Sequence, residues 1–184
     1  NRVFDVTPSF VDCYSTKLRL DAEMELLHKY LPLPTGKRVL KIDLWDEVHN
    51  SGFLMRVASE GAGVFGLDIS DHIVHNASKN FAKSGLPASL VVADMRFIPF
   101  PDAAFDLVWQ IGTIEHVHDP SRVFLEVYRV LKPGGIAIMG CPNRHDPFGS
   151  QFVIKGLSML GHWPYGEELS FSYADLESFM YQAG

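Results

Sequence analysis

Cysteine is scarce in this sequence, which holds only Cys13 and Cys141, far apart along the chain. Two such residues form neither a zinc-ligand spacing nor a disulfide framework, so we expect a reducing compartment and a cytoplasmic protein. No apolar run is long enough to span a membrane, and no signal peptide is recognisable. We therefore expect no membrane partner.

Basic charge is also in short supply. The 184 residues carry 16 basic and 22 acidic side chains, a formal net charge of −6, and no dense basic patch. Nucleic-acid binding needs a basic footprint, so we expect no nucleic-acid partner. The length suits one domain with a substantial core. We divide it into an N-terminal helical cap (1–34), a cofactor-binding core (35–141) and a substrate-side C-terminal region (142–184).

Five short apolar runs alternate with helical patterns. Their near-continuous apolar character indicates strands buried on both faces, which is typical of a parallel, doubly wound α/β sheet. The predicted strands cover residues 37–42, 64–69, 89–93, 105–111 and 135–141.

Helix starts are marked by capping residues. Asp21 is the predicted N-cap of a helix over 22–30, and Asp119-Pro120 combines a cap with a proline at the first helical position. Ser172 and Asp175 have the spacing of a capping box. Residues 43–52, between the first strand and the next helix, are predicted to form a loop.

Acidic residues end two of the predicted strands. Parallel sheets bind ligands outside the carboxyl ends of their strands, so the loops after the first four strands should form the site. Asp68 suits the hydroxyls of a ribose, Asp94 suits an exocyclic amine, and Met95 suits the face of a purine. Each aspartate is equally well explained as a helix or turn cap, and both interpretations remain open.

These features together resemble class I S-adenosylmethionine-dependent methyltransferases of the small-molecule, type 11 kind. The resemblance covers roughly residues 35–141 and rests on segments in matching order: Val39-Leu40, Gly66-Leu67-Asp68-Ile69-Ser70, Val92-Ala93-Asp94-Met95, Ile98-Pro99-Phe100, Phe105-Asp106-Leu107-Val108, Glu115-His116-Val117 and 129–135. It implies a Rossmann-like sheet with strand order 3-2-1-4-5.

The same resemblance implies a cofactor, S-adenosylmethionine, and a small-molecule methyl acceptor. Asp68 and Ile69 would bind the ribose, Asp94 and Met95 the adenine, and Gln110 and Ile111 the methionine part. His116 titrates near neutrality and is a candidate base for an acceptor that carries a proton. A histidine there also suits the start of a helix, which is the stronger interpretation. No metal site is expected.

The first cofactor motif departs from the family pattern. Lys41 stands where the family has an acid, and of the usual glycine-rich loop only Gly52 is left. Trp45 and Glu47 would crowd the space that glycines leave for a ligand. Alternatively, Asp43 or Glu47 pairs with the methionine ammonium and Trp45 faces the sulfonium.

The end of the chain departs as well, because the family sheet finishes with an antiparallel hairpin after a helix like that at 172–182. The sequence stops at Ala183-Gly184, so we expect a sheet without that hairpin and with an exposed fifth strand. The oligomeric state is not predictable from these patterns.

Two other functions compete with methyl transfer. The altered loop motivates a degenerate methyltransferase fold that acts as a binding or scaffold subunit. A dinucleotide-binding oxidoreductase has a similar sheet, but it needs phosphate-cradling glycines that this loop lacks.

The remaining candidates have plainer explanations. His72 and His75 are expected on a solvated helix face, since a metal site would need a third ligand. His145-Asp146 could approach a substrate, but these residues are expected to be ordinary polar residues of a surface loop. Five aromatic residues either cover a hydrophobic substrate pocket or pack the last helix onto the sheet, and both interpretations remain open. They are Phe148, Phe152, Trp163, Tyr165 and Phe171.

Overall fold

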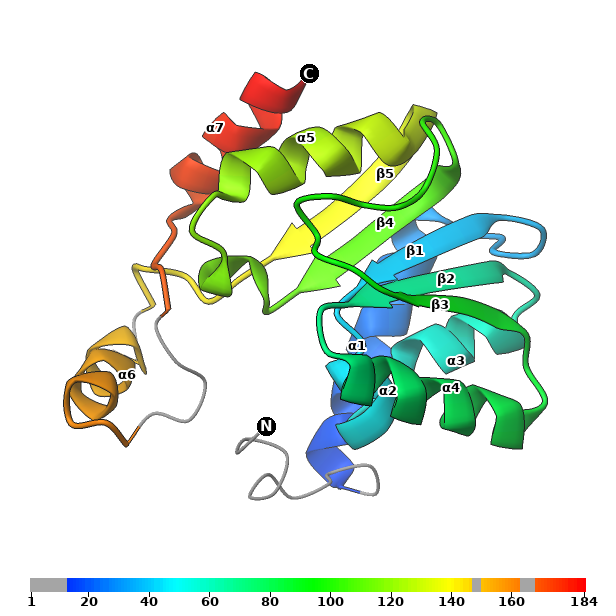
Figure 1. Cartoon of the computed structure of the whole chain (residues 1–184), viewed down its shortest axis with the longest axis horizontal. Coiled ribbons are helices and arrows are strands. Elements are labelled where there is room, and N and C mark those ends of the chain that lie inside the picture. Colours follow the sequence, from blue (N-terminus) through cyan, green and yellow to red (C-terminus); the bar gives the residue numbers. More distant parts are fainter. Residues whose placement is uncertain (1–12, 147–149, 163–167) are drawn as a thin grey trace.

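A five-stranded parallel sheet forms the centre of the protein. The structure is a computed structural model that describes residues 13–146, 150–162 and 168–184 (Figure 1). The strand order is β3-β2-β1-β4-β5, which confirms the expected doubly wound α/β fold. The strands are β1 (Arg38–Ile42), β2 (Gly63–Asp68), β3 (Ala88–Val92), β4 (Phe105–Ile111) and β5 (Leu131–Gly140).

Two hydrophobic cores lie on opposite faces of this sheet, as alternating side chains of each strand require. One core is formed by α1 (Tyr14–Tyr30), α3 (Phe53–Ser59) and α4 (Asp71–Ser84), and it centres on Phe53, whose ring stacks on Trp109 at 4.2 Å. The other core is formed by α5 (Pro120–Val130) and α7 (Tyr173–Ala183), whose rings Phe124 and Phe179 stack at 5.5 Å. Figure 1 shows these two helical layers on either side of the sheet.

The capping signals read from the sequence are confirmed. Ser70 accepts a hydrogen bond from the backbone N–H of Ile73 at the start of α4, and Asp119 does the same for Arg122 in α5. Both arms of the Ser172–Asp175 capping box are present at α7. These caps satisfy donors that a helix start otherwise leaves unpaired.

Three boundaries were predicted wrongly. Helix α1 begins at Tyr14 rather than after Asp21, because Thr16 already faces the core at helical spacing with Glu23 and Leu27. Strand β5 begins at Leu131, directly after α5, and a register shift opposite β4 brings it into line.

The third wrong boundary concerns the loop predicted at 43–52, which contains a short helix, α2 (Trp45–His49). A 3₁₀ turn, η1 (Ile114–His116), follows β4. Both short elements lie at the carboxyl end of the sheet, where they shape the site.

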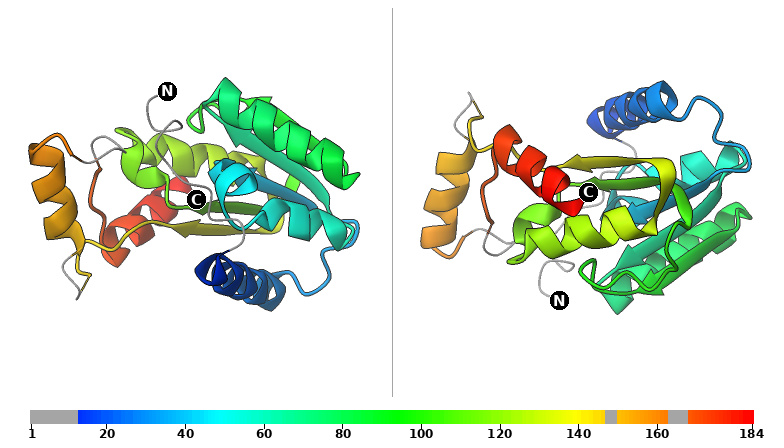
Figure 2. Two further views of the ribbon diagram at one scale, coloured as in Figure 1. Left: turned by 90° about the horizontal axis from the view of Figure 1, so that it is seen from below. Right: turned by 90° about the horizontal axis from the view of Figure 1, so that it is seen from above.

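Beyond β5 the chain leaves the sheet. Helix α6 (Ser150–Met159) lies apart from it in every view (Figures 1 and 2). An isolated parallel bridge between Asn143 and Phe171 ties the segment after β5 to the segment before α7. Across the described ranges, no helix is both long and apolar enough to cross a bilayer.

Candidate functional site

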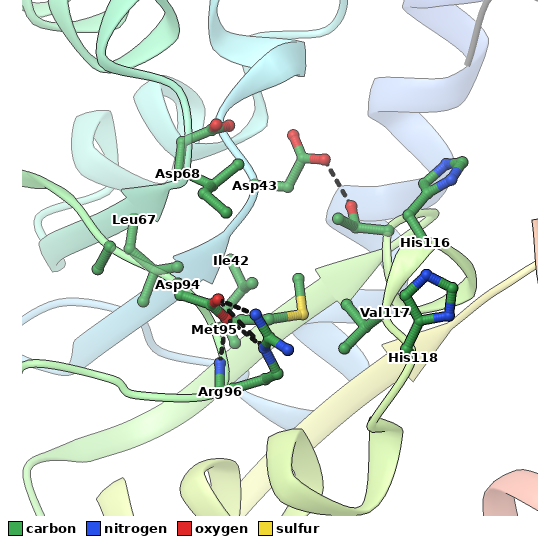
Figure 3. A pocket seen from close by; sticks show the side chains of 13 residues that line it. Ile42, Asp43, Leu67, Asp68, Asp94, Met95, Arg96, His116, Val117 and His118 are labelled. Carbon is green, nitrogen blue, oxygen red and sulfur yellow. Dashed lines mark hydrogen bonds and ion pairs between the residues drawn. The ribbon is translucent and has the colours of Figure 1, made fainter. Parts of the chain in front are cut away.

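A cavity of about 250 Å³ opens at the carboxyl ends of β1 to β4. Figure 3 shows that carboxylates from three different strand ends surround it, with histidines on the opposite wall. The residues that line it are Ile42, Asp43, Leu67, Asp68, Ile69, Ala93, Asp94, Met95, Arg96, Thr113, His116, Val117 and His118. The structure thus brings Asp43, Asp68, Ile69, Asp94, Met95 and His116 of the sequence-derived set around one space.

Asp43 follows β1 with a positive φ of 76°, a conformation that aspartate tolerates better than most residues. Its Oδ1 accepts a hydrogen bond from the backbone N–H of Trp45 at 2.7 Å. Its Oδ2 accepts one from the Thr113 hydroxyl, in the turn after β4. The two bonds hold this carboxylate at the cavity wall.

Asp68 ends β2 and is only 9% exposed. Its carboxylate accepts hydrogen bonds from the backbone N–H groups of Leu44, at 2.9 Å, and Ser70, at 2.8 Å. Burial and the nearby charge of Asp43 raise the pKa of Asp68, and the two backbone donors only partly oppose this. The turn-cap interpretation of Asp68 is therefore correct, and the same carboxylate also faces the cavity.

Asp94 follows β3 and is bound by Arg96. The Arg96 guanidinium places Nε 3.0 Å from Oδ1 and Nη2 2.5 Å from Oδ2, and the Arg96 backbone N–H donates to Oδ1 as well. Hydrogen bonding by Arg96 lowers the pKa of Asp94. The arginine lines the cavity beside the carboxylate that it orients.

The wall across from these acids is set by β4. Gln110 is completely buried at the end of that strand. In the amide orientation that places its oxygen toward the turn after β4, Gln110 accepts hydrogen bonds from the backbone N–H groups of Thr113, at 2.9 Å, and Ile114, at 3.1 Å. This fixes the turn that presents Thr113 and the exposed His116 to the cavity.

Lys41 is the centre of a buried ionic cluster behind the cavity. It is 3% exposed, and its ammonium lies 3.5 Å from Asp46 and 3.6 Å from Glu47. Arg19 of α1 joins the cluster through Asp46 and Glu23, each at 3.0 Å. Burial alone would lower the pKa of Lys41, but the surrounding carboxylates raise it to about 12.

Several residues expected at the cofactor do not line the cavity. The Glu47 carboxylate is buried, where it pairs with Lys41 and accepts from the backbone N–H of Leu54 at 2.9 Å. The Trp45 ring stacks on His49 at 4.2 Å. Gly52, Gln110 and Ile111 are likewise absent from its lining residues. The expectation that Trp45 and Glu47 crowd the ligand space is wrong, because α2 turns them away from it.

The plainer candidates are placed as follows. His72 contacts Asn76 one turn along α4. No group of three or more histidine, cysteine or acidic side chains suited to a metal ion occurs among the described residues. Of the aromatic group, Phe152 is 83% exposed, whereas Phe171 is buried against Phe179. Phe148, Trp163 and Tyr165 lie outside the described residues.

Arg96, Thr113 and His118 were missed by sequence reasoning. A single arginine two residues after an aspartate forms no recognisable pattern, and neither does one threonine after a strand. Only the position of Thr113 and His118 in the loop after a predicted strand pointed to this edge of the sheet.

The comparisons with known proteins agree with this geometry. A family model described as a methyltransferase domain matches residues 49–139. The ubiquinone/menaquinone biosynthesis C-methyltransferase UbiE of Desulfotalea psychrophila is 31% identical over 72% of this chain and 55% of that protein. The 27-O-demethylrifamycin SV methyltransferase of Amycolatopsis mediterranei is 34% identical over 60% of this chain and 40% of that protein. The chain thus spans about half the length of these relatives.

Solved structures share the fold. The PH0226 protein from Pyrococcus horikoshii OT3 superposes with a TM-score of 0.76 and 22% identity, over 99% of this chain and 89% of that one. The [4+2]-cyclase SpnF superposes with a TM-score of 0.70 and 25% identity, over 89% of this chain and 56% of that one. Taken together, the sheet order and these matches define a Rossmann-like methyltransferase fold. The chain belongs to the class I S-adenosylmethionine-dependent methyltransferases, whose cofactor is S-adenosylmethionine.

Proposed function

We propose that this protein transfers a methyl group from S-adenosylmethionine to a small-molecule acceptor. The observation that supports this most is that the ends of β1, β2 and β3 carry Asp43, Asp68 and Asp94 around one cavity. The cofactor offers a cationic end, ribose hydroxyls and an adenine amine, and a carboxylate suits each of them. The residues present therefore fit the cofactor.

Each carboxylate has a distinct proposed role. Asp68 accepts hydrogen bonds from the ribose hydroxyls while its turn bonds to Leu44 and Ser70 hold it still. Asp94 accepts from the adenine amine, and the buried Met95 side chain lies against the ring. Asp43 faces the cationic methionine end. Ile69 adds apolar contact beside the ribose.

S-adenosylmethionine supplies a methyl group on a positively charged sulfur. The protein's contribution is mainly to hold the acceptor in line with that methyl and to exclude water. His116, on the opposite wall of the cavity, is the proposed proton acceptor where the acceptor atom carries a proton. Residues 142–184, which follow β5, are the proposed acceptor side.

The acceptor class is inferred from relatives. UbiE is named for quinone biosynthesis and the Amycolatopsis enzyme for a rifamycin, both small molecules. The apolar part of the cavity wall, which includes Leu67 and Val117, is compatible with such compounds. The cytoplasmic location stays a prediction.

Titration calorimetry with S-adenosylhomocysteine tests cofactor binding directly. We expect binding to wild type and a loss of at least about tenfold in affinity for Asp68→Asn, which removes the charge but keeps the shape. Arg56→Met, on the exposed face of α3, is the control and should bind like wild type. If the folded wild-type protein gives no heat of binding at millimolar ligand, the proposal is wrong.

A scaffold role without catalysis is the second candidate, and the replacement of the glycine-rich loop favours it. The loop does not fill the cavity, however, because Glu47 is bound behind it and Asn80 of α4 donates to the Glu47 backbone carbonyl. This candidate predicts that Asp68→Ala leaves biological activity unchanged. Loss of activity in a folded Asp68→Ala protein would count against it.

A further inference from the structure

Two carboxylates in the cavity form no ion pair with any residue that the structure describes. The ionic cluster behind the cavity contains two cations, Lys41 and Arg19, and both are already paired with acids of that cluster: Glu23, Asp46 and Glu47. Within the described ranges, neither Asp43 nor Asp68 forms an ion pair. The Lys41 ammonium donates to the Asp43 backbone carbonyl rather than to its carboxylate, so its charge acts on Asp43 and Asp68 through space, without an ion pair to either.

The negative charge of Asp43 acts on the neighbouring carboxylate of Asp68. Burial is the largest cause of the raised pKa of Asp68, and the charge of Asp43 is the second largest. Two like charges held this close in a partly buried cavity favour a ligand that places a positive charge between them. The remaining partners of Asp43, the Trp45 N–H and the Thr113 hydroxyl, are neutral donors that leave this preference in place.

We infer that Asp43 makes this site selective for the charge state of the cofactor, so that the sulfonium form binds more tightly than its demethylated product. This rests on the proposed function and adds a specificity-determining residue to it. The family pattern has a glycine-rich loop here, and a glycine offers no charge to the ligand. In this chain, a side chain occupies the position and brings a carboxylate into the cavity.

The consequence follows from the electron balance of methyl transfer. A lone pair on the acceptor atom forms the new bond to the methyl carbon, and the electrons of the broken carbon–sulfur bond return to sulfur. Sulfur changes from cationic to neutral, and a proton on the acceptor atom, if present, passes to a base. The ligand therefore loses the positive charge at sulfur at the moment of reaction and keeps the one at its ammonium, which weakens product binding and favours release.

Three ligands isolate this effect. S-adenosylmethionine and S-adenosylhomocysteine share the adenosine, ammonium and carboxylate groups and differ at the sulfur. Sinefungin carries an amine on the carbon that replaces the sulfur, so it restores a positive charge without a transferable methyl. Dissociation constants for all three are measured by titration calorimetry on the whole chain, at low ionic strength because salt screens the effect.

For wild type we expect both cationic ligands to bind about tenfold more tightly than S-adenosylhomocysteine, the effect of roughly one pKa unit of charge interaction. Asp43→Asn should abolish this preference, and any loss of contact with the ammonium, which all three ligands carry, should weaken the three alike. The asparagine oxygen can still accept from the Trp45 N–H, its NH₂ can donate to the Thr113 hydroxyl oxygen, and asparagine tolerates the positive φ at this position. Asp43→Gly, which removes the side chain, should give the same ratio of affinities.

The matched control is Asp94→Asn at the opposite, adenine end of the cavity. It should weaken all three ligands alike and keep the ratio of wild type. An unchanged ratio in folded Asp43→Asn, or sinefungin that binds like S-adenosylhomocysteine, would overturn the inference and leave the proposed function standing. Failure of all three ligands to bind wild type would instead count against the proposed function.

Discussion

The Lys41 ammonium lies 2.7 Å from the backbone carbonyl oxygen of Asp43. One buried cation thereby reaches the residue whose carboxylate lines the cavity, while it also pairs with Asp46 and Glu47 behind it. The lysine at the end of β1 is therefore a structural support for the site, and the charges around it form one coupled group.

Removal of the Lys41 charge should be costly. Lys41→Met leaves the buried Glu47 carboxylate without the ammonium that it pairs with and leaves Asp46 with Arg19, and we expect the free energy of unfolding to fall by about 3–5 kcal/mol in urea denaturation. The triple variant Lys41→Met, Asp46→Asn, Glu47→Gln removes both signs of charge together and should recover most of the loss. A single variant as stable as wild type would show that the cluster contributes nothing.

Gly66 allows β2 to pass close to the site loop. A Cβ built there would lie 2.6 Å from Leu44 Cδ2 and 2.9 Å from Leu90 Cδ2, so Gly66→Ala should destabilise the fold by about 1–3 kcal/mol. Because the Leu44 N–H binds Asp68, affinity for S-adenosylhomocysteine should fall in parallel. Thermal unfolding and calorimetry measure the two effects.

The control for Gly66→Ala is Gly156→Ala in α6, where a Cβ meets nothing within 4 Å. Alanine is the better helix former, so this variant should be neutral or slightly stabilised. Equal destabilisation by both substitutions would contradict a close-packing role for Gly66.

Glu115 should make stability depend on pH. It is 4% exposed, its Oε2 has no hydrogen-bond partner among the residues that the structure describes, and burial raises its pKa. The folded state thus binds the proton more tightly than the unfolded state, so this contribution is present below about pH 4.3 and is lost as pH rises through the folded pKa.

Glu115→Gln removes that titration, and at pH 8 we expect it to be more stable than wild type by about 1 kcal/mol. Melting temperatures measured from pH 5 to 8 should diverge steadily between the two proteins. A gap between them that does not change with pH would rule out this explanation.

Arg96 should support cofactor binding through Asp94. Arg96→Met frees that carboxylate from its bidentate partner, and we expect about three- to tenfold weaker binding of S-adenosylhomocysteine. Arg122→Met is a demanding control, since Arg122 reaches this region through the Arg96 backbone carbonyl, pairs with Glu126 rather than with Asp94, and should have a smaller effect. Tighter binding by Arg96→Met would mean that the arginine competes with the adenine instead.

Sequence patterns predicted the parallel sheet and most helix caps, because these depend on local periodicity and capping chemistry. The strand order was an implication of the resemblance to the methyltransferase family. The start of α1 was misjudged because Asp21 has the form of a cap but sits within a helix that its buried Leu27 and Met24 hold against the core. Helix α2 was missed because it depends on tertiary contacts, which a five-residue segment does not reveal.

The site was predicted at the right edge of the sheet but not in its details. Asp68 and Asp94 were found because ligands bind at the carboxyl ends of parallel strands. Asp43 was named as a residue of the altered loop that could pair with the methionine ammonium. Glu47 was expected at the cofactor because an acid is rarely buried unless it has a partner. Its partner, Lys41, lies six residues earlier on a strand. No local pattern in the sequence shows which of the neighbouring acids a buried lysine takes.

The ionic cluster behind the cavity also limits how this protein can have diverged from its relatives. A return of Lys41 to an acid, taken alone, would set a third negative charge beside Asp46 and Glu47, inside the core. Replacement of Asp46 and Glu47 by small residues, taken alone, would leave the buried Lys41 ammonium without its two acidic partners. The substitutions are therefore tied to one another, and the lysine and its acids are expected to be inherited together or lost together.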